Sequence, residues 1–237
     1  MGSSPRSVLP QCLVGVLLAS GPALASNGRL LTTDAAEVVD VPVLGLQRSA
    51  VALPAGFALD TALLGDLVLV LNGGLRWGAE LDVHRLVLGA RYSQFVGTPV
   101  YSALLNTQES QLQRYEPALS GPSFYGVYGI ELGSLLLQLE GKVELMAETT
   151  ASLTAGAKFQ LTPAWGVIVE GGVRGYPGRV ETTPPAASAP FFRGAAGLRF
   201  GGETGQVTLG VAYVGIEDPM IGSFPFAPVL DLAWSFR

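Results

Sequence analysis

The sequence has one cysteine, one histidine and few charges: only 14% of its 237 residues are charged, whereas about 25% is usual for a globular protein. A single cysteine, Cys12, excludes a disulfide framework. The net charge is −5 and the acidic residues are scattered, which excludes the basic surface that a nucleic-acid partner requires. Mean hydropathy is nevertheless +0.40. Such an apolar chain is typical of membrane proteins.

Long hydrophobic runs are also missing, although a transmembrane helix needs about 20 apolar residues. The longest candidate beyond the N-terminus, from Leu63 to Leu71, is interrupted by Asp66 and followed by Asn72-Gly73-Gly74. Thirty-one glycines and sixteen prolines also disfavour long helices. In hydrocarbon every backbone polar group must be paired within the protein, so only helices and closed barrels can span a membrane. The composition therefore predicts a β-barrel.

The N-terminus has the features of a secretory signal peptide over residues 1–25. Arg6 provides the positive charge, Cys12 to Leu18 the short apolar run, and Ala23-Leu24-Ala25 a cleavage site before Ser26. We interpret residues 26–45 as a periplasmic lead-in, with folding into the barrel mouth as the alternative. Residues 46–237 are predicted to form the barrel.

Period-two alternation is the main indication of strands, because successive side chains of a strand point to opposite faces. The pattern is clearest over residues 137–148. There Leu137, Leu139, Gly141, Val143, Leu145 and Ala147 alternate with Gln138, Glu140, Lys142, Glu144, Met146 and Glu148. A barrel in a membrane has this pattern, with the apolar face toward lipid. A soluble β-sandwich also alternates, but it would expose the charged face to water and carry more charge.

Ten segments alternate in this way, and their even number suits a barrel with both chain ends on one side. They are residues 50–63, 67–80, 85–93, 123–132, 137–148, 150–161, 165–174, 192–200, 206–213 and 226–236. We therefore predict an all-β fold: a transmembrane antiparallel up-and-down barrel of about ten strands, with eight or twelve as the alternatives. Short periplasmic turns are expected near 79–82, 132–135, 161–164 and 201–205. Long outer connections are expected at 96–121, 177–189 and 217–225.

The last strand, Leu230-Asp231-Leu232-Ala233-Trp234-Ser235-Phe236, ends on aromatic residues. Together with the signal peptide and the amphipathic strands, it resembles Gram-negative outer-membrane β-barrel proteins, although no single family among them. The resemblance implies an outer-membrane location. It also implies two partners, outer-membrane lipid and the assembly machinery that recognises the terminal strand.

The polar parity of the strands is predicted to line the lumen. Charges in a narrow lumen should form pairs, because an unpaired buried charge is costly. The lining can be interpreted as an ion-lined pore or as a charge-paired filling of a closed barrel. The charged residues on this face are Asp60, Arg76, Glu80, Arg85, Arg91, Glu131, Glu140, Lys142, Glu144, Lys158, Glu170, Arg174, Arg193, Arg199 and Asp231.

No motif for catalysis, metal or cofactor binding is present, and we expect neither enzyme activity nor a cofactor. The single histidine, His84, has the parity of Leu86 and Leu88 and is expected to face outward at the rim. A hydrolase site would require a serine or an aspartate beside it. The predicted function is a barrel with a largely closed lumen and a structural or binding role through its outer loops. The alternative is a narrow passive channel for small polar or amphipathic solutes.

Overall fold

The computed structural model describes residues 31–36, 39, 42–63, 69–105, 120–146, 149–162, 164–176, 191–201, 205–213 and 226–236. The expected signal peptide therefore lies outside the described residues. So do the predicted outer connections at 177–189 and 217–225. Among the residues described, no helix combines the length and apolar character needed to cross a membrane.

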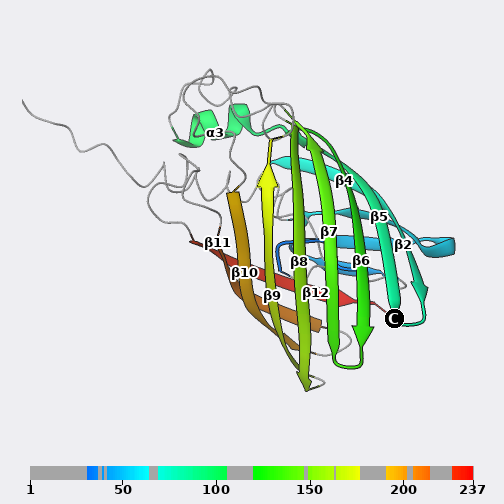
Figure 1. Cartoon of the computed structure of the whole chain (residues 1–237). Helices are drawn as coiled ribbons and strands as arrows, with labels where there is room; N and C mark the ends of the chain where they lie inside the picture. Colours follow the sequence, from blue (N-terminus) through cyan, green and yellow to red (C-terminus); the bar gives the residue numbers. More distant parts are fainter. Residues whose placement is uncertain are drawn as a thin grey trace, which may run out of the picture.

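The described strands form a single closed antiparallel barrel (Figure 1). Short elements come first along the chain: β1 (Val43–Gly45), β2 (Ser49–Ala52), the 3-10 turn η1 (Pro54–Gly56) and β3 (Phe57–Thr61). The long strands follow: β4 (Val70–Leu81), β5 (His84–Phe95), β6 (Gly121–Leu132), β7 (Leu135–Leu145), β8 (Thr149–Thr162), β9 (Trp165–Gly175), β10 (Phe191–Gly201), β11 (Gly205–Tyr213) and β12 (Phe226–Ser235).

The barrel closes where β1 pairs with β12. Val43 lies opposite Ser235 and Gly45 opposite Ala233, in antiparallel register. Every other strand pairs with its sequence neighbours. Closure removes the exposed strand edges that would otherwise present unpaired backbone groups. The predicted all-β, antiparallel, up-and-down barrel is therefore confirmed.

The main estimate of ten strands is wrong: the described residues form twelve, one of the two alternatives. The segment 50–63, expected as one strand, is divided by η1 into β2 and β3. Ala55 and Gly56 have positive φ angles of 60° and 79°, and a Cβ on Gly56 would lie 2.3 Å from the carbonyl oxygen of Gly78. This tight turn breaks the alternation on which the estimate relied. The other additional strand, β1, comes from the segment interpreted as a lead-in.

The short connections lie where they were expected. Residues 82–83 join β4 to β5, and residues 133–134 join β6 to β7. Asp82 and Gly133 have the positive φ angles that such tight turns need, 57° and 61°. The predicted long connection 96–121 is not wholly irregular, because it contains the helix α3 (Thr98–Leu105).

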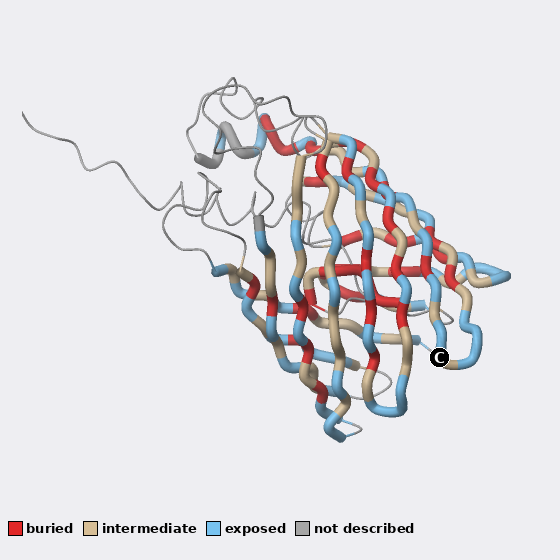
Figure 2. Tube along the Cα trace, viewed as in Figure 1, coloured by how far each residue is buried: buried red, intermediate tan, exposed pale blue. Residues whose placement is uncertain are grey.

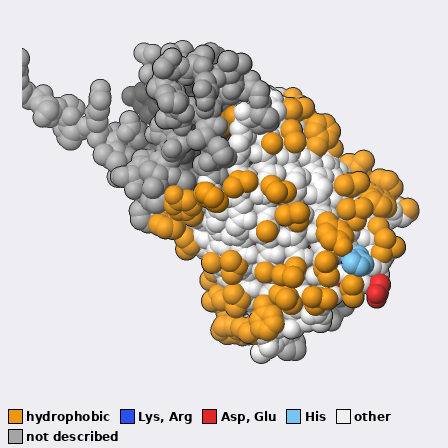
Figure 3. Space-filling model, in the orientation of Figure 1, with side chains coloured by type: hydrophobic (Ala, Val, Ile, Leu, Met, Phe, Trp, Pro, Cys, Tyr) orange, Lys and Arg blue, Asp and Glu red, His pale blue; other side chains and the backbone are white. Residues whose placement is uncertain are grey.

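The two faces of the wall have opposite character, as the alternation predicted. Figure 2 shows buried and exposed residues following one another along the strands. Large apolar side chains are exposed on the outside of every strand from β4 to β12, including Val169 at 53% and Leu209 at 48%. The face drawn in Figure 3 is covered by hydrophobic side chains, and no lysine or arginine shows among its described residues. The interior contains buried arginines, aspartates and glutamates. A soluble sandwich would have the reverse arrangement.

The wall from β1 to β3 is built from short strands, and the chain folds inward there. Residues 46–48 connect β1 to β2. Gln47 and Arg48 are almost completely buried, at 1% and 0% exposure. The Gln47 backbone N–H donates to Asp231 Oδ1 on β12 at 3.3 Å. This inward turn brings Arg48 into the lumen.

Candidate functional site in the barrel lumen

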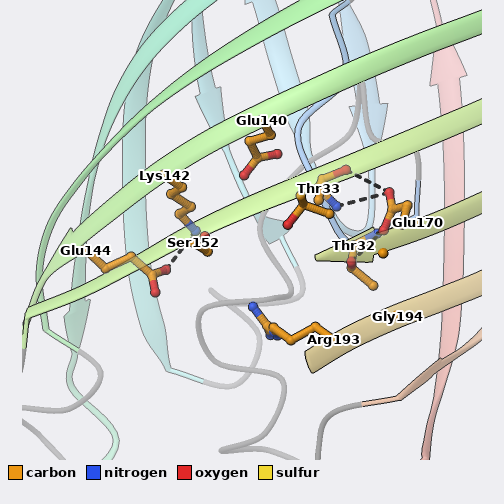
Figure 4. A pocket seen from close by; sticks show the side chains of 11 residues that line it. Thr32, Thr33, Glu140, Lys142, Glu144, Ser152, Glu170, Arg193 and Gly194 are labelled. Carbon is orange, nitrogen blue, oxygen red and sulfur yellow. Dashed lines mark hydrogen bonds and ion pairs between the residues drawn. The ribbon is translucent and has the colours of Figure 1, made fainter. Parts of the chain in front are cut away.

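Residues 31–36 lie inside the barrel. Of the two alternatives for the segment 26–45, its described part therefore matches folding into the barrel and not a periplasmic lead-in. Backbone N–H groups of Leu31, Thr32 and Thr33 donate to the carboxylate of Glu170, at 2.6, 2.7 and 3.3 Å. The Thr32 and Thr33 hydroxyls donate to the same carboxylate at 2.5 and 2.7 Å (Figure 4). Five donors thus satisfy one buried anion, which needs such compensation in a closed interior.

Two side chains of β7 continue this contact along the segment. Glu140 accepts a hydrogen bond from the Asp34 amide at 2.5 Å. Gln138 accepts one from the Ala36 amide at 3.1 Å and donates to the Asp34 carbonyl at 2.7 Å. The Gln138 side chain therefore pairs with the segment much as a neighbouring strand would, through one donor and one acceptor.

Apolar contacts hold both ends of the segment. Leu31 is 2% exposed and packs with Ile168, Ala195 and Ala212. A Cβ atom added to Gly197 would lie 2.7 Å from Leu31 Cδ1, and one added to Gly210 would lie 2.7 Å from Leu31 Cδ2. A side chain at either position would also meet the wall backbone, because the carbonyl oxygens of Leu209 and Ala196 lie 2.7 and 2.8 Å from the respective Cβ positions.

The other end, Ala36, packs with Val87, Tyr125 and Val127. Its methyl group lies 2.6 Å from the Cβ position of Gly129. The segment thus packs one large apolar side chain, Leu31, and one small one, Ala36, against the wall.

A buried ion network joins the segment to the opposite wall. Arg48 forms ion pairs with Asp60 on β3 and, at 3.3 Å, with Asp34. Arg91 on β5 bonds to Asp60 at 3.0 Å. Arg76 on β4 donates to the Ala35 carbonyl at 3.2 Å. All four charged groups of the Arg48–Asp34–Asp60–Arg91 network are buried, so each depends on the others for compensation.

A small polar cavity of about 20 Å³ lies beside the segment, between Thr32, Thr33 and the wall residues Lys142, Glu144 and Arg193 (Figure 4). That volume holds about one water molecule. Glu144 accepts from Lys142 at 2.7 Å and from Arg174 at 2.6 Å. The Thr150 hydroxyl donates to Glu144 at 3.0 Å. The charges around the cavity are therefore largely paired.

The remaining predicted lumen residues lie away from this cavity. Arg85 pairs with Glu131 and, at 3.6 Å, with Glu80, in a partly exposed cluster beside the β4–β5 turn. Arg199 donates to the Thr208 hydroxyl at 3.2 Å, and Lys158 is half-buried on β8. Asp231 accepts the hydrogen bond from the backbone N–H of Gln47. The lumen therefore contains one central site and separate peripheral pairs.

His84 lies at the outside of the β4–β5 turn, where its parity placed it. Its Nδ1 is 2.7 Å from the Tyr128 hydroxyl, and the two rings stack with centroids 5.9 Å apart. Both side chains are exposed. Within the described part of the chain, no group of three or more His, Cys, Asp or Glu residues could hold a metal ion.

Sequence reasoning offered the barrel mouth only as the alternative for residues 26–45 and missed Arg48, although residues 31–36 and Arg48 together form the centre of the site. Alternation assigns a face only to residues within a regular strand, and neither lies in one. The available signal was a lone arginine in a predominantly apolar stretch, because such a charge needs an acidic partner elsewhere in the fold.

Comparison with known proteins identifies the fold but no family. No protein-family model matches the chain, and no curated protein matches it by sequence. Among solved structures, the NanC porin aligns with a TM-score of 0.53 at 6% identity, over 80% of this chain and 90% of that one. The chain has the fold of an outer-membrane porin. This fold and the apolar outer face agree with the outer-membrane location predicted from the sequence.

Other porin-type structures resemble this barrel less. Salmonella typhi OmpF aligns with a TM-score of 0.43 at 10% identity, over 76% of this chain. Outer-membrane expressed OmpT of Vibrio cholerae aligns with 0.41 at 7%, over 80% of this chain. The chain spans only 56% and 64% of the lengths of these two proteins.

Proposed function

We propose that this protein is an outer-membrane barrel with a closed lumen that serves as a structural or binding element, without enzyme activity. The observation that carries the proposal is that residues 31–36 lie in the lumen and contact the wall. Backbone donors of this segment satisfy Glu170, Glu140 and Gln138. A segment held by so many direct contacts leaves little space for solute, and the adjoining cavity of about 20 Å³ admits about one water molecule.

The Arg48–Asp60–Arg91 network supports the same proposal. A hydrated pore would solvate these charges separately, whereas here they compensate one another in the interior. The apolar outer face contacts outer-membrane lipid in this proposal, and the working surface is provided by the connections opposite the short turns.

The second candidate is a narrow channel for small polar or amphipathic solutes. It is favoured by the fold shared with the NanC porin and by the polar lining of the lumen. The two candidates differ in whether water connects the two sides of the barrel.

Planar-bilayer recording on the purified full-length protein separates the two candidates. We expect no steady conductance across a range of voltages, because the seated segment blocks the lumen. Heat-modifiable gel mobility of the same preparation serves as the control that the barrel is folded. Steady conductance in most insertions, altered by Glu140→Gln or Arg174→Met, would contradict the closed lumen and support the channel.

A further inference from the structure

Residues 31–36 contact the wall as a peptide contacts a receptor. Three wall side chains accept the backbone N–H groups of five of the six residues: Glu170 those of 31, 32 and 33, Glu140 that of 34, and Gln138 that of 36. Hydrogen bonds to the backbone together with pockets for selected side chains are the features by which proteins bind peptides; here the segment is bent at residues 31–33 and 36.

The two apolar pockets provide the side-chain selection. The Leu31 pocket has glycines at 197 and 210, and the Ala36 pocket has a glycine at 129, so both are shaped by missing wall side chains. Between the pockets, Arg48 pairs with Asp34 and Arg76 with the Ala35 carbonyl. The wall therefore contacts every residue of the segment.

The wall does not need the segment to complete its own backbone pairing. The strands β7, β8, β9 and β10 pair with one another over nearly their whole lengths. The segment is attached to them through side-chain hydrogen bonds, ion pairs and apolar contacts. It can therefore leave without breaking the pairing between these four strands.

We propose that the lumen contains a binding site for a bent six-residue peptide, that residues 31–36 are its tethered ligand, and that their departure opens the lumen. This inference rests on the closed lumen proposed above. Departure would expose Glu140, Gln138 and Glu170, all polar, and would join the vacated volume to the cavity at Lys142 and Arg193. A continuous polar space of this kind fills with water and conducts small ions.

Gly129→Ala is the substitution that tests the site. The added methyl group would stand 2.6 Å from the Ala36 methyl, while its next neighbours, in Leu136 and Leu137, are at 3.4 and 3.5 Å. The clash therefore falls on the segment and scarcely on the wall. Overpacking of this kind should shift the equilibrium toward the displaced segment by about tenfold or more.

The readout is the labelling rate of a cysteine in the segment. Thr33→Cys, in a chain that also carries Cys12→Ala, places a near-isosteric thiol at a position that is 7% exposed. A small charged methanethiosulfonate should label it slowly in the parent and about tenfold or more faster with Gly129→Ala. Steady bilayer conductance should appear in the same variant.

The matched control is the compensating change Ala36→Gly. It removes the methyl group that Gly129→Ala contacts and retains the amide that donates to Gln138. The pair Gly129→Ala/Ala36→Gly should return both labelling and conductance toward the parent values. Glu170→Gln, which removes the charge without adding volume, should also accelerate labelling and serves as the test variant if Gly129→Ala barrels do not assemble.

Labelling and conductance distinguish this inference from the proposed function. Conductance of the parent would overturn the closed lumen, while the labelling series would still test the peptide site. Parent-like labelling of Gly129→Ala in folded barrels, or a failure of Ala36→Gly to restore slow labelling, would overturn the peptide site. Faster labelling without any conductance would overturn the opening of the lumen.

Discussion

Asp60→Ala should destabilise the barrel by about 3–5 kcal/mol, because it removes the only acid that contacts both Arg48 and Arg91 in the described network. All three side chains are almost completely buried. Two buried guanidinium groups would then lose the carboxylate that they share, although Arg48 would keep its ion pair with Asp34. Urea titration of the barrel folded into lipid vesicles, followed by tryptophan fluorescence and by gel mobility, measures the change in the free energy of unfolding.

Glu131→Ala is the matched control for Asp60→Ala. It also breaks an ion pair of an arginine, Arg85, but the two side chains are 41% and 23% exposed. Water can replace the lost partner there, so the expected loss is about 0–1 kcal/mol. Equal losses for the two variants would show that water reaches Asp60 as freely as it reaches the rim, which would contradict a closed lumen.

Val169→Arg should cost about 2–4 kcal/mol, because it places a charge on the lipid-facing side near the middle of β9. Val169 is 53% exposed on the outside of the barrel. In water an arginine there would be harmless, whereas in hydrocarbon it has no partner. Leu209→Arg, near the middle of β11, should behave in the same way.

Val169→Leu is the control at the same position, since it changes the side chain without adding charge and should be close to neutral. The measurement is again urea titration in vesicles. A loss with Val169→Arg no larger than with Val169→Leu would mean that this face contacts water, and it would remove the basis for a membrane barrel.

The partners of the charged side chains change how the lining of the lumen is interpreted. From sequence, the near balance of acids and bases favoured a largely closed lumen, with a narrow channel as the alternative. In the structure, Glu140 and Glu170 bind backbone amides of the chain's own segment, while Glu144 binds Lys142 and Arg174. Each of these acids therefore has its own partners within the protein.

The sequence by itself determined the fold class, the face of each regular strand and the position of the short turns. These follow from local rules: alternation with period two, the absence of long apolar runs, and turn residues such as Gly133. Only the tertiary structure decided that twelve strands close the wall, because β1 pairs with β12 across nearly 190 residues and the turn at Ala55-Gly56 interrupts the pattern. It alone placed residues 31–36 and Arg48 in the lumen. Their partners, Glu170, Gln138 and Asp60, are distant in the chain or lie on other elements, and side-chain pairing of this kind leaves no periodic trace in the sequence.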